Sequence, residues 1–351
     1  MAGLIVEGKG QTPNGKGEGQ VLVLAPNWLG DAVLALPAIA DVRRAFAGAR
    51  LAVAARRSIA GVFRLVADVD DVLPLQSDAR WWRLSAFRSD VELLRPFDVA
   101  ILFPNSFRSA WLVRRAGIAE RWGYRTDARV RLLTRAVPRS KGGHQAEYYQ
   151  RLTSALGLPA GPAAPAIDVP DDLRTAAQEL LASRGYRAGS MLVVLAPGAA
   201  YGKAKQWTPA HVASLIEQLE REQSATCVLV GSAADAGTAA EIRRTAVSDR
   251  LIDLTGQTSL DQLAGVLAVS HVCVSNDSGA MHLAAAVGTR VVATFGPTNE
   301  QATRPLPRPD RRADVLVHDV WCRPCMLREC PIDHRCMTGL APARVFDAIV
   351  R

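Results

Sequence analysis

The chain has 351 residues, of which 49% are hydrophobic and 22% charged, an ordinary composition for a folded globular protein. Its length exceeds that of one typical core, so two domains are expected, and its formal charge of +8 favours an anionic partner. No apolar run approaches the roughly 20 residues of a membrane-spanning helix, and the start lacks the long apolar core of a signal peptide. We therefore expect a cytoplasmic protein whose six cysteines are reduced.

The first half of the chain has the pattern of a parallel α/β sheet. Residues 1–20 are expected to be a disordered leader, because their second part is rich in glycine and polar residues. The apolar run that follows is typical of a strand buried on both faces, and an apolar-rich helix then ends near Phe46. The strands predicted in this half lie at residues 21–25, 51–55, 71–75 and 98–103.

The second half repeats this organisation after a break. Residues 160–170 form a Pro/Ala/Gly-rich run typical of an interdomain linker, and a helix is expected directly after it. Strands are then predicted at residues 191–196, 226–230, 251–254, 271–275 and 291–294. The sequence therefore predicts two doubly wound α/β domains, residues 21–170 and 171–351, facing a cleft with ligands at the carboxyl ends of the strands.

The stretch 271–290 carries the clearest binding signal. Its strand leads through the polar residues 276–278 into a helix at 279–287. A strand that enters a helix through a glycine-containing turn directs free backbone N–H groups, and the helix dipole, at an anion such as phosphate. His282 lies one turn after Ser278 on the same face and could reach that anion. The alternative is an ordinary capped helix with an incidental histidine.

Asp31 follows the first strand at the start of a helix, on the rim of the expected cleft. A carboxylate there could act as a general base toward a hydroxyl group. The alternative is a first-turn residue that satisfies backbone donors and the helix dipole. Neither half of the chain carries the full Gly-x-Gly-x-x-Gly fingerprint, which disfavours a nicotinamide-dependent dehydrogenase.

Two further positions could contact a nucleotide. Lys203 and Lys205 lie in a glycine-containing loop after the strand at 191–196 and could neutralise a diphosphate, although they could also be surface lysines. Asp235 follows the next strand and could accept hydrogen bonds from a ribose diol. It could equally cap the helix that follows.

Four cysteines, Cys322, Cys325, Cys330 and Cys336, form a compact cluster that includes His334. Thiolates and imidazole suit a structural zinc ion, but the spacing lacks the two separated Cys-x-x-Cys pairs of common zinc ribbons. Reduced thiols or a redox-labile disulfide are the alternatives. Nothing in the sequence suggests a catalytic metal.

Basic residues crowd one stretch of the first half, together with Trp111, Trp122 and Tyr124. Nucleic acid could bind such a surface through phosphates and stacking, and a phosphorylated glycolipid at a membrane face could bind it as well. A scattered solvated face is the plain alternative. The basic residues are Arg114, Arg115, Arg121, Arg125, Arg129, Arg131, Arg135, Arg139 and Lys141.

Several motifs, in this order and spacing, resemble those of the ADP-heptose:lipopolysaccharide heptosyltransferases. The motifs are Asn27-Trp-Leu-Gly-Asp31, the loop 197–207, Ser275-Asn-Asp-Ser-Gly-Ala-Met-His282 and Phe295-Gly-Pro-Thr298. The resemblance runs from about Val21 to the C-terminal helix, and the middle loop is more similar to heptosyltransferase II than to I. It implies a GT-B fold of two Rossmann-like domains, with an acceptor side, a donor side, and a last helix that is a candidate for packing back on the first domain.

The resemblance also assigns roles to residues of this chain. It implies that Asp31 is the general base and that Lys205 contacts the donor phosphates. It implies that Asp277, Ser278, Gly279 and His282 cradle the diphosphate, with Asp277 expected to hold the loop because it is itself negative. Asp235 is carried over as the ribose contact on a looser match. Arg121 and Arg125 are the candidates for acceptor binding on the basic surface.

The implied reaction is an inverting, metal-independent transfer of heptose from ADP-heptose to a lipid A–Kdo–heptose type acceptor, with no catalytic cofactor. The implied partners are this donor, this acceptor and the inner face of the cytoplasmic membrane, and no nucleic acid. The cysteine cluster leaves the acceptor open, since it belongs to only some branches of the family. The alternatives are a related GT-B transferase that uses another sugar nucleotide, and a non-enzymatic module that binds nucleic acid or lipid A.

Overall fold

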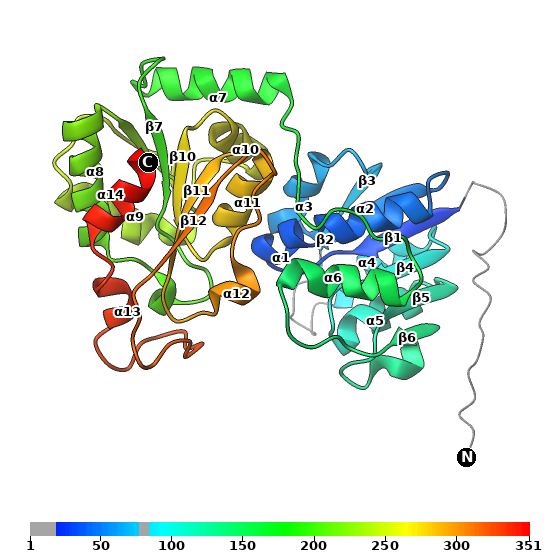
Figure 1. The fold of residues 1–351 in the computed structure, drawn as a ribbon. Coiled ribbons are helices and arrows are strands. Elements are labelled where there is room, and N and C mark those ends of the chain that lie inside the picture. Colours follow the sequence, from blue (N-terminus) through cyan, green and yellow to red (C-terminus); the bar gives the residue numbers. More distant parts are fainter. Residues whose placement is uncertain (1–18, 77–83) are drawn as a thin grey trace.

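The computed structural model describes residues 19–76 and 84–351, so the predicted leader lies almost entirely outside the described residues. Two parallel six-stranded sheets organise the described chain, and each is flanked by helices (Figure 1). The sheets follow one another in sequence without exchanging strands. This is the α/β architecture of two doubly wound domains that the sequence predicts.

We call residues 20–155 the first domain. Its sheet has the strand order β3-β2-β1-β4-β5-β6, so the chain winds outward from β1 on one side and then crosses to β4 on the other. The strands are β1 (Gln20–Leu24), β2 (Arg50–Arg56), β3 (Asp71–Leu75), β4 (Val99–Leu102), β5 (Glu120–Tyr124) and β6 (Arg135–Val137). The helices are α1 (Leu29–Leu34), α2 (Leu36–Ala45), α3 (Arg57–Arg64), α4 (Leu84–Leu94), α5 (Phe107–Arg115), the 3-10 turn η1 (Arg129–Leu132) and α6 (Gln145–Ala155).

We call residues 171–350 the second domain. Its sheet, in the order β12-β11-β10-β7-β8-β9, crosses between β7 and β10 in the same way. The strands are β7 (Leu192–Ala196), β8 (Thr226–Leu229), β9 (Leu251–Asp253), β10 (Val272–Asn276), β11 (Arg290–Phe295) and β12 (Ala313–Val317). The helical segments are α7 (Asp171–Ser183), η2 (Lys203–Lys205), α8 (Pro209–Gln223), η3 (Ala233–Asp235), α9 (Ala236–Thr245), α10 (Leu260–Ala268), α11 (Gly279–Val287), α12 (Glu300–Thr303), α13 (Arg335–Thr338) and α14 (Pro342–Val350).

Three strands of these sheets, β5, β6 and β12, were absent from the sequence prediction. The strand β5 lies in the basic stretch that the sequence assigns to a surface, yet Trp122 and Tyr124 are 3% and 1% exposed. Charged residues at its start hid the strand, because a buried arginine breaks the apolar pattern of a central strand.

The segment 156–170 crosses from the first domain to the second (Figure 1). Its end is fixed to the second domain, because the Ile167 N–H donates to the Ala286 carbonyl at 2.9 Å and Arg308 donates to the Ile167 carbonyl. The side chain of Ile167 is also buried. The end of the predicted linker is therefore packed against the second domain.

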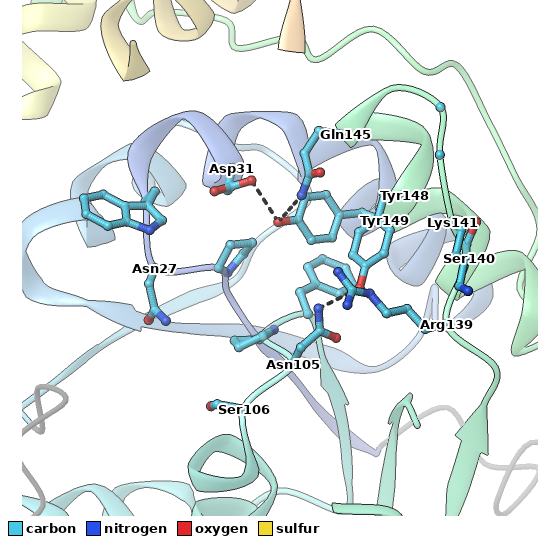
Figure 2. A pocket seen from close by; sticks show the side chains of 16 residues that line it. Asn27, Asp31, Asn105, Ser106, Arg139, Ser140, Lys141, Gln145, Tyr148 and Tyr149 are labelled. Carbon is cyan, nitrogen blue, oxygen red and sulfur yellow. Dashed lines mark hydrogen bonds between the residues drawn. The ribbon is translucent and has the colours of Figure 1, made fainter. Parts of the chain in front are cut away.

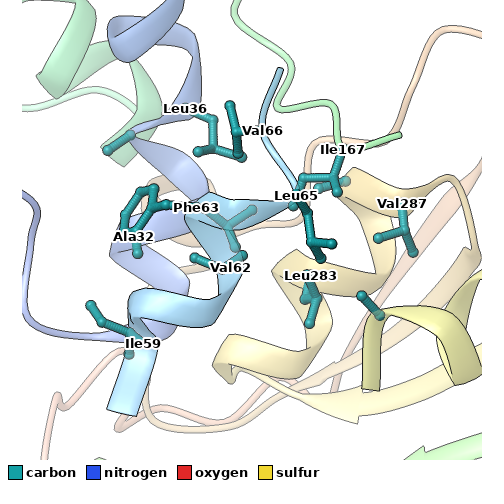
Figure 3. Packing of buried hydrophobic residues seen from close by; sticks show 14 of the residues in the cluster. Ala32, Leu36, Ile59, Val62, Phe63, Leu65, Val66, Ile167, Leu283 and Val287 are labelled. Atoms are coloured by element: carbon teal, nitrogen blue, oxygen red, sulfur yellow. The ribbon is translucent and has the colours of Figure 1, made fainter. Parts of the chain in front are cut away.

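One hydrophobic cluster runs through both domains. On the first-domain side it includes Val62 and Phe63 of α3, and on the second-domain side Leu283 and Val287 of α11 (Figure 3). The helix pairs α1–α11 and α3–α10 are in contact across this boundary. The shared apolar cluster favours the observed arrangement of the domains, because separating them would expose it to water.

The final helix corrects one expectation. Among the described residues, helix α14 makes its main contacts with α8 and β11 of its own domain rather than with the first domain. Its buried residues Val345, Phe346 and Ile349 join a cluster formed by second-domain residues only. The apolar face of α14 is thus used up within the second domain.

Candidate active site

Each sheet places a loop of the candidate site at the point where its strand order reverses. In the first domain, the loops after β1 and β4 meet there, and in the second domain those after β7 and β10 do. Crevices at such switch points are the usual ligand sites of doubly wound sheets. Asp31 follows β1, whereas Lys205 follows β7 and Asp277 follows β10.

Asp31 lies in the first turn of α1, whose N-cap residue, Trp28, makes no side-chain cap. Its Oδ1 accepts a hydrogen bond from the Tyr149 hydroxyl at 3.2 Å, and that hydroxyl accepts one from Gln145 at 3.1 Å (Figure 2). Burial raises the pKa of Asp31, while Tyr149, Gln145 and the charge of Lys205 act against this rise. A carboxylate with a raised pKa binds a proton more strongly than an ordinary one, which suits a general base.

A pocket of about 540 Å³ opens beside Asp31, and first-domain residues line it. Its charged walls carry Arg139 and Lys141, and its polar walls include Asn105, whose amide donates to the Tyr148 hydroxyl at 2.6 Å (Figure 2). The lining residues are Pro26, Asn27, Trp28, Asp31, Phe103, Pro104, Asn105, Ser106, Arg139, Ser140, Lys141, Gly142, Gly143, Gln145, Tyr148 and Tyr149. The pocket is large enough for a sugar-sized ligand and is basic on one side.

Lys205 and Asp277 form a buried ion pair in the second domain. The Lys205 Nζ lies 2.6 Å from Asp277 Oδ2, and the two side chains are 13% and 5% exposed. Thr298 donates to the same Asp277 oxygen at 2.7 Å. Asp277 therefore holds the lysine loop, as the sequence predicts, and Lys205 is oriented by this carboxylate.

The start of α11 has the form of an anion site. Ser278 is the N-cap residue, but its side chain makes no capping bond and instead hydrogen-bonds the Ser275 hydroxyl at 2.9 Å. The N–H groups of the first turn are thus left without a side-chain acceptor, at the positive end of the helix dipole. This corrects the capping role expected for residues 276–278: Asn276 instead accepts from the Trp207 N–H and donates to the Pro197 carbonyl.

Two glycines bring α1 and α11 into direct contact. A Cβ atom on Gly30 would lie 2.9 Å from the Cδ2 of His282, and one on Gly279 would lie 2.7 Å from the Cβ of Leu29. His282 is buried against this junction, its Nδ1 has no partner among the described residues, and burial lowers its pKa to about 4. His282 is therefore neutral and packs the two helix starts together, and its contact with a diphosphate remains a prediction.

His144 links the domains a second time. As N-cap of α6 its Nδ1 accepts from the Ala146 N–H at 3.2 Å, while its Nε2 lies 2.9 Å from the Arg304 carbonyl of the second domain. A carbonyl oxygen can only accept, so the proton is on Nε2 and the ring is neutral. Burial lowers the pKa of His144 in agreement with this state.

The remaining predicted residues lie apart from this junction. The Asp235 carboxylate accepts from the N–H and the hydroxyl of Ser232 in the capping box of η3, and it also abuts Gly198 of the β7 loop. It makes no side-chain cap on α9, so the expected alternative of a cap for the following helix is wrong. Its contact with a ribose remains a prediction. Arg125 is exposed and remains a candidate for acceptor binding.

Arg121 must be removed from the acceptor-binding candidates. It is 9% exposed, and its guanidinium donates to the carbonyls of Ile118, Ala119 and Leu132. Burial lowers its pKa. A guanidinium whose N–H groups donate to nearby backbone carbonyls supports the fold and is not available to a ligand.

The four clustered cysteines line one small pocket together with His334. Within the described ranges, however, no three His, Cys, Asp or Glu side chains stand where they could share a metal ion. His334 instead places its Nε2 2.7 Å from the Ala204 carbonyl, beside Lys205. The structural zinc at the four cysteines stays a prediction. With or without a metal ion, His334 of this loop contacts the segment that carries Lys205.

Sequence reasoning missed the residues that surround Asp31. Gln145, Tyr148 and Tyr149 lie on α6, more than a hundred residues after Asp31, and only the folded sheet brings them together. Arg139 and Lys141 were counted in the basic stretch without a role, and both line the pocket. The only sequence feature that could have indicated Arg139 and Lys141 is their position just before α6.

Two Rossmann-like domains in contact across their switch points define the GT-B class of glycosyltransferases. The sequence profile of glycosyltransferase family 9 (heptosyltransferase) matches residues 88–335. The chain belongs to this family and is a glycosyltransferase, so the non-enzymatic alternative is excluded.

Individual relatives agree with this assignment. The chain is 31% identical over 307 residues to lipooligosaccharide heptosyltransferase 2 of Haemophilus ducreyi, covering 82% of this chain and 86% of that protein. The solved structure of Escherichia coli ADP-heptose lps heptosyltransferase II is 27% identical, with a TM-score of 0.79 over 94% of this chain and 98% of that one. The E. coli heptosyltransferase WaaC with ADP, 21% identical, has a TM-score of 0.72 over 94% and 99% and shows the same fold.

Proposed function

We propose that this chain transfers L-glycero-D-manno-heptose from ADP-heptose to the inner core of lipopolysaccharide, as the second heptose. One observation carries the proposal: α1, which places Asp31 beside the first-domain pocket, packs against the start of α11, next to the Lys205–Asp277 ion pair of the second domain. In this proposal, the base Asp31 of the first domain therefore lies next to the phosphate-binding site of the second domain. The names of the relatives support heptose as the sugar and the second position as the acceptor.

The acceptor enters the first-domain pocket in this proposal. Inner-core sugars carry carboxylates and phosphates, and Arg139 and Lys141 supply the opposite charge. Trp28, 54% exposed at the pocket rim, offers an apolar face to a sugar ring. Arg125 remains a further candidate for this side.

The chemistry follows from the two carboxylates and the helix start. Asp31 takes the proton of the acceptor hydroxyl while that oxygen forms a bond to the anomeric carbon of the donor. The bond from this carbon to the phosphate oxygen breaks on the opposite face, ADP leaves with the electron pair, and the configuration inverts. The charge that develops on ADP is stabilised by Lys205 and by the free N–H groups of α11, so no metal ion or other catalytic cofactor is required.

The donor residues divide the remaining work. Ser278 and Gly279 present the backbone of the α11 start to the diphosphate, and Asp277 keeps Lys205 in place. His282, neutral and buried, holds α11 against α1 and so sets the distance between donor and base. Asp235 is proposed to receive the ribose.

The direct test is product formation from ADP-heptose and a defined inner-core acceptor, followed by mass analysis. A panel of sugar nucleotides assayed for release of the nucleotide separates this proposal from a related transferase with another donor. Turnover that persists in excess chelator supports the metal-independent mechanism, and loss of turnover that added Mg²⁺ restores contradicts it. Preference for another donor would overturn the assignment of heptose.

A structural zinc at Cys322, Cys325, Cys330 and Cys336 remains part of the proposal. Metal analysis of the purified protein is its test, with about one zinc per chain expected. Since the loop contacts the Lys205 segment, removal of zinc should weaken donor binding more than acceptor binding.

We also propose that the enzyme works in the cytoplasm at the inner face of the cytoplasmic membrane, where a lipid-linked acceptor would be met. Across the described residues, no helix is both long and apolar enough to cross a bilayer. We propose a peripheral contact with the membrane, and nucleic acid is not among the expected partners.

A further inference from the structure

Helix α5 carries an unusual row of exposed side chains. Phe107, Trp111 and Arg115 follow one another at intervals of four residues and so share one face of the helix. The rings of Phe107 and Trp111 stack with centroids 6.4 Å apart, and the Arg115 guanidinium lies 5.7 Å from the centre of the Trp111 ring. Phe107 and Trp111 are nevertheless 48% and 40% exposed.

The neighbouring helix α4 extends this row. The two helices are in contact, and Arg108 of α5 lies over the ring of Phe87 of α4 at 5.4 Å. Leu84, one turn before Phe87, is 63% exposed. We define the α4–α5 face by its exposed residues Leu84, Arg88, Phe107, Trp111, Arg114 and Arg115.

The arginines of this face are not neutralised by neighbours. Within the part of the chain that the structure describes, no carboxylate forms an ion pair with Arg88, Arg114 or Arg115. The face therefore combines exposed apolar rings with uncompensated positive charge. Long arginine side chains that flank aromatic rings are typical of surfaces lying at a membrane interface.

A second group of exposed apolar residues provides a contrast. Trp321, Met326, Leu327 and Ile332 are exposed on the cysteine loop. The arginines of that loop are largely paired, because Arg323 contacts Glu300 and Asp319, and Arg335 contacts Asp333. Apolar exposure alone is common to both regions, whereas uncompensated charge distinguishes the α4–α5 face.

The face also begins at the rim of the acceptor pocket. Pro104, Asn105 and Ser106 line the pocket, and Ser106 is the N-cap of α5, so Phe107 is the next residue along the chain. A ligand held in the pocket by its sugar would have the α4–α5 face beside it. A membrane contact on this face would therefore lie next to the pocket that is proposed to take the lipid-linked acceptor.

We propose that the α4–α5 face docks on an anionic lipid bilayer, with Phe107 and Trp111 at the level of the lipid headgroups and the arginines over acidic phosphates. This inference deepens the proposed function and rests on it for the reason to bind a membrane. Each arginine near an anionic surface strengthens binding by roughly fivefold, and salt screens this attraction.

The test is sedimentation of the full chain with phosphatidylcholine vesicles, with and without phosphatidylglycerol. We expect the native protein to bind the anionic vesicles, with weaker binding at high salt. The F107S/W111S and R114S/R115S variants should each lose binding by about tenfold or more. The matched control is Trp321→Ser, which removes an equally large exposed ring from the other domain and should bind as the native protein does.

Activity separates this inference from the proposed function. The F107S/W111S variant should retain turnover of a deacylated, soluble acceptor, which also shows that it folds, and lose turnover of the same acceptor embedded in vesicles. Unchanged vesicle binding in both double variants, or an equal loss of binding in the Trp321→Ser variant, would overturn the proposal that the α4–α5 face docks on the bilayer. Absence of heptosyl transfer by the native chain would instead refute the function and leave the vesicle result to stand by itself.

Discussion

Two carboxylates, one from each domain, are assigned to the same site by the proposed function, and their surroundings differ. Asp277 is paired with Lys205 at 2.6 Å and receives a further bond from Thr298, so its charge is compensated. Asp31 has the neutral donors Tyr149 and Gln145 beside it, and burial raises its pKa. The difference separates two tasks: a compensated carboxylate orients a cation, whereas one without a cationic contact remains able to take a proton.

The Asp31→Asn substitution should have the largest effect. Loss of the base is expected to lower kcat by about 10³, with little change in the KM for the donor. Folding should not suffer, because a carboxyl with a raised pKa contributes its stability below its unfolded pKa and loses it as the pH rises through the folded value. Thermal unfolding at neutral pH should therefore show an equal or higher Tm, and a kcat within tenfold of the native value would contradict the role of Asp31.

Substitution of Lys205 tests the role of its partner, Asp277. Lys205→Met should lower kcat/KM for the donor by about 10² and leave Asp277 buried without its cation, destabilising the fold by about 3 kcal/mol. The K205M/D277N double variant is the matched control, since it removes both charges. Denaturant unfolding should show recovered stability in the double variant, while steady-state kinetics should show that donor use stays low. Recovery of activity as well would mean that Lys205 acts only through the fold.

The contact between α1 and α11 at Gly30 and Gly279 sets the distance between Asp31 and the Lys205–Asp277 pair. Gly30→Ala would place a Cβ 2.9 Å from His282 and force α1 and α11 apart, so kcat/KM should fall by about tenfold. Gly237→Ala in α9, where nothing lies within 4 Å of the new atom, is the control and should leave activity intact. Adding His282→Ala to Gly30→Ala should cost less than the two separate effects combined, as measured by a double-mutant cycle.

The smallest change concerns the tuning of Asp31. Tyr149→Phe keeps the ring that packs on Phe103 but removes the hydroxyl that stabilises the Asp31 carboxylate. The pKa of Asp31 should rise further, so the acidic limb of the kcat/KM profile should move to higher pH. A shift toward lower pH would show that Tyr149 does not favour the ionised base. Turnover above this limb should change only a few-fold.

Much of the fold follows from pattern alone, because central parallel strands are continuous apolar runs between recognisable turns. The strand β5 escaped this reasoning, since Arg121 is buried there and satisfied by carbonyls of its own loop. Charge predicts exposure only on average, and no sequence pattern reveals which arginine is paired with the backbone.

The site divides in the same way. Asp31, Asp277 and Ser278 could be found because strand ends and helix starts are local features with their own turn chemistry. Tyr149 could not, because its hydroxyl reaches Asp31 only after α6 has packed against α1. The bonding of Ser278 to Ser275, which leaves the helix start open, likewise depends on a contact that spacing does not specify.

The neutral ring of His144 has a mechanical consequence. It fastens the first turn of α6 to the Arg304 carbonyl of the second domain, and the same turn carries Gln145 while Tyr149 lies one turn further on. A rotation of the second domain that kept this bond would move α6, whose Tyr149 hydroxyl donates to Asp31 and opposes the burial-driven rise of its pKa. We therefore expect a change in the angle between the domains to shift the Tyr149 hydroxyl relative to the Asp31 carboxylate, in addition to disturbing the α1–α11 and α3–α10 contacts.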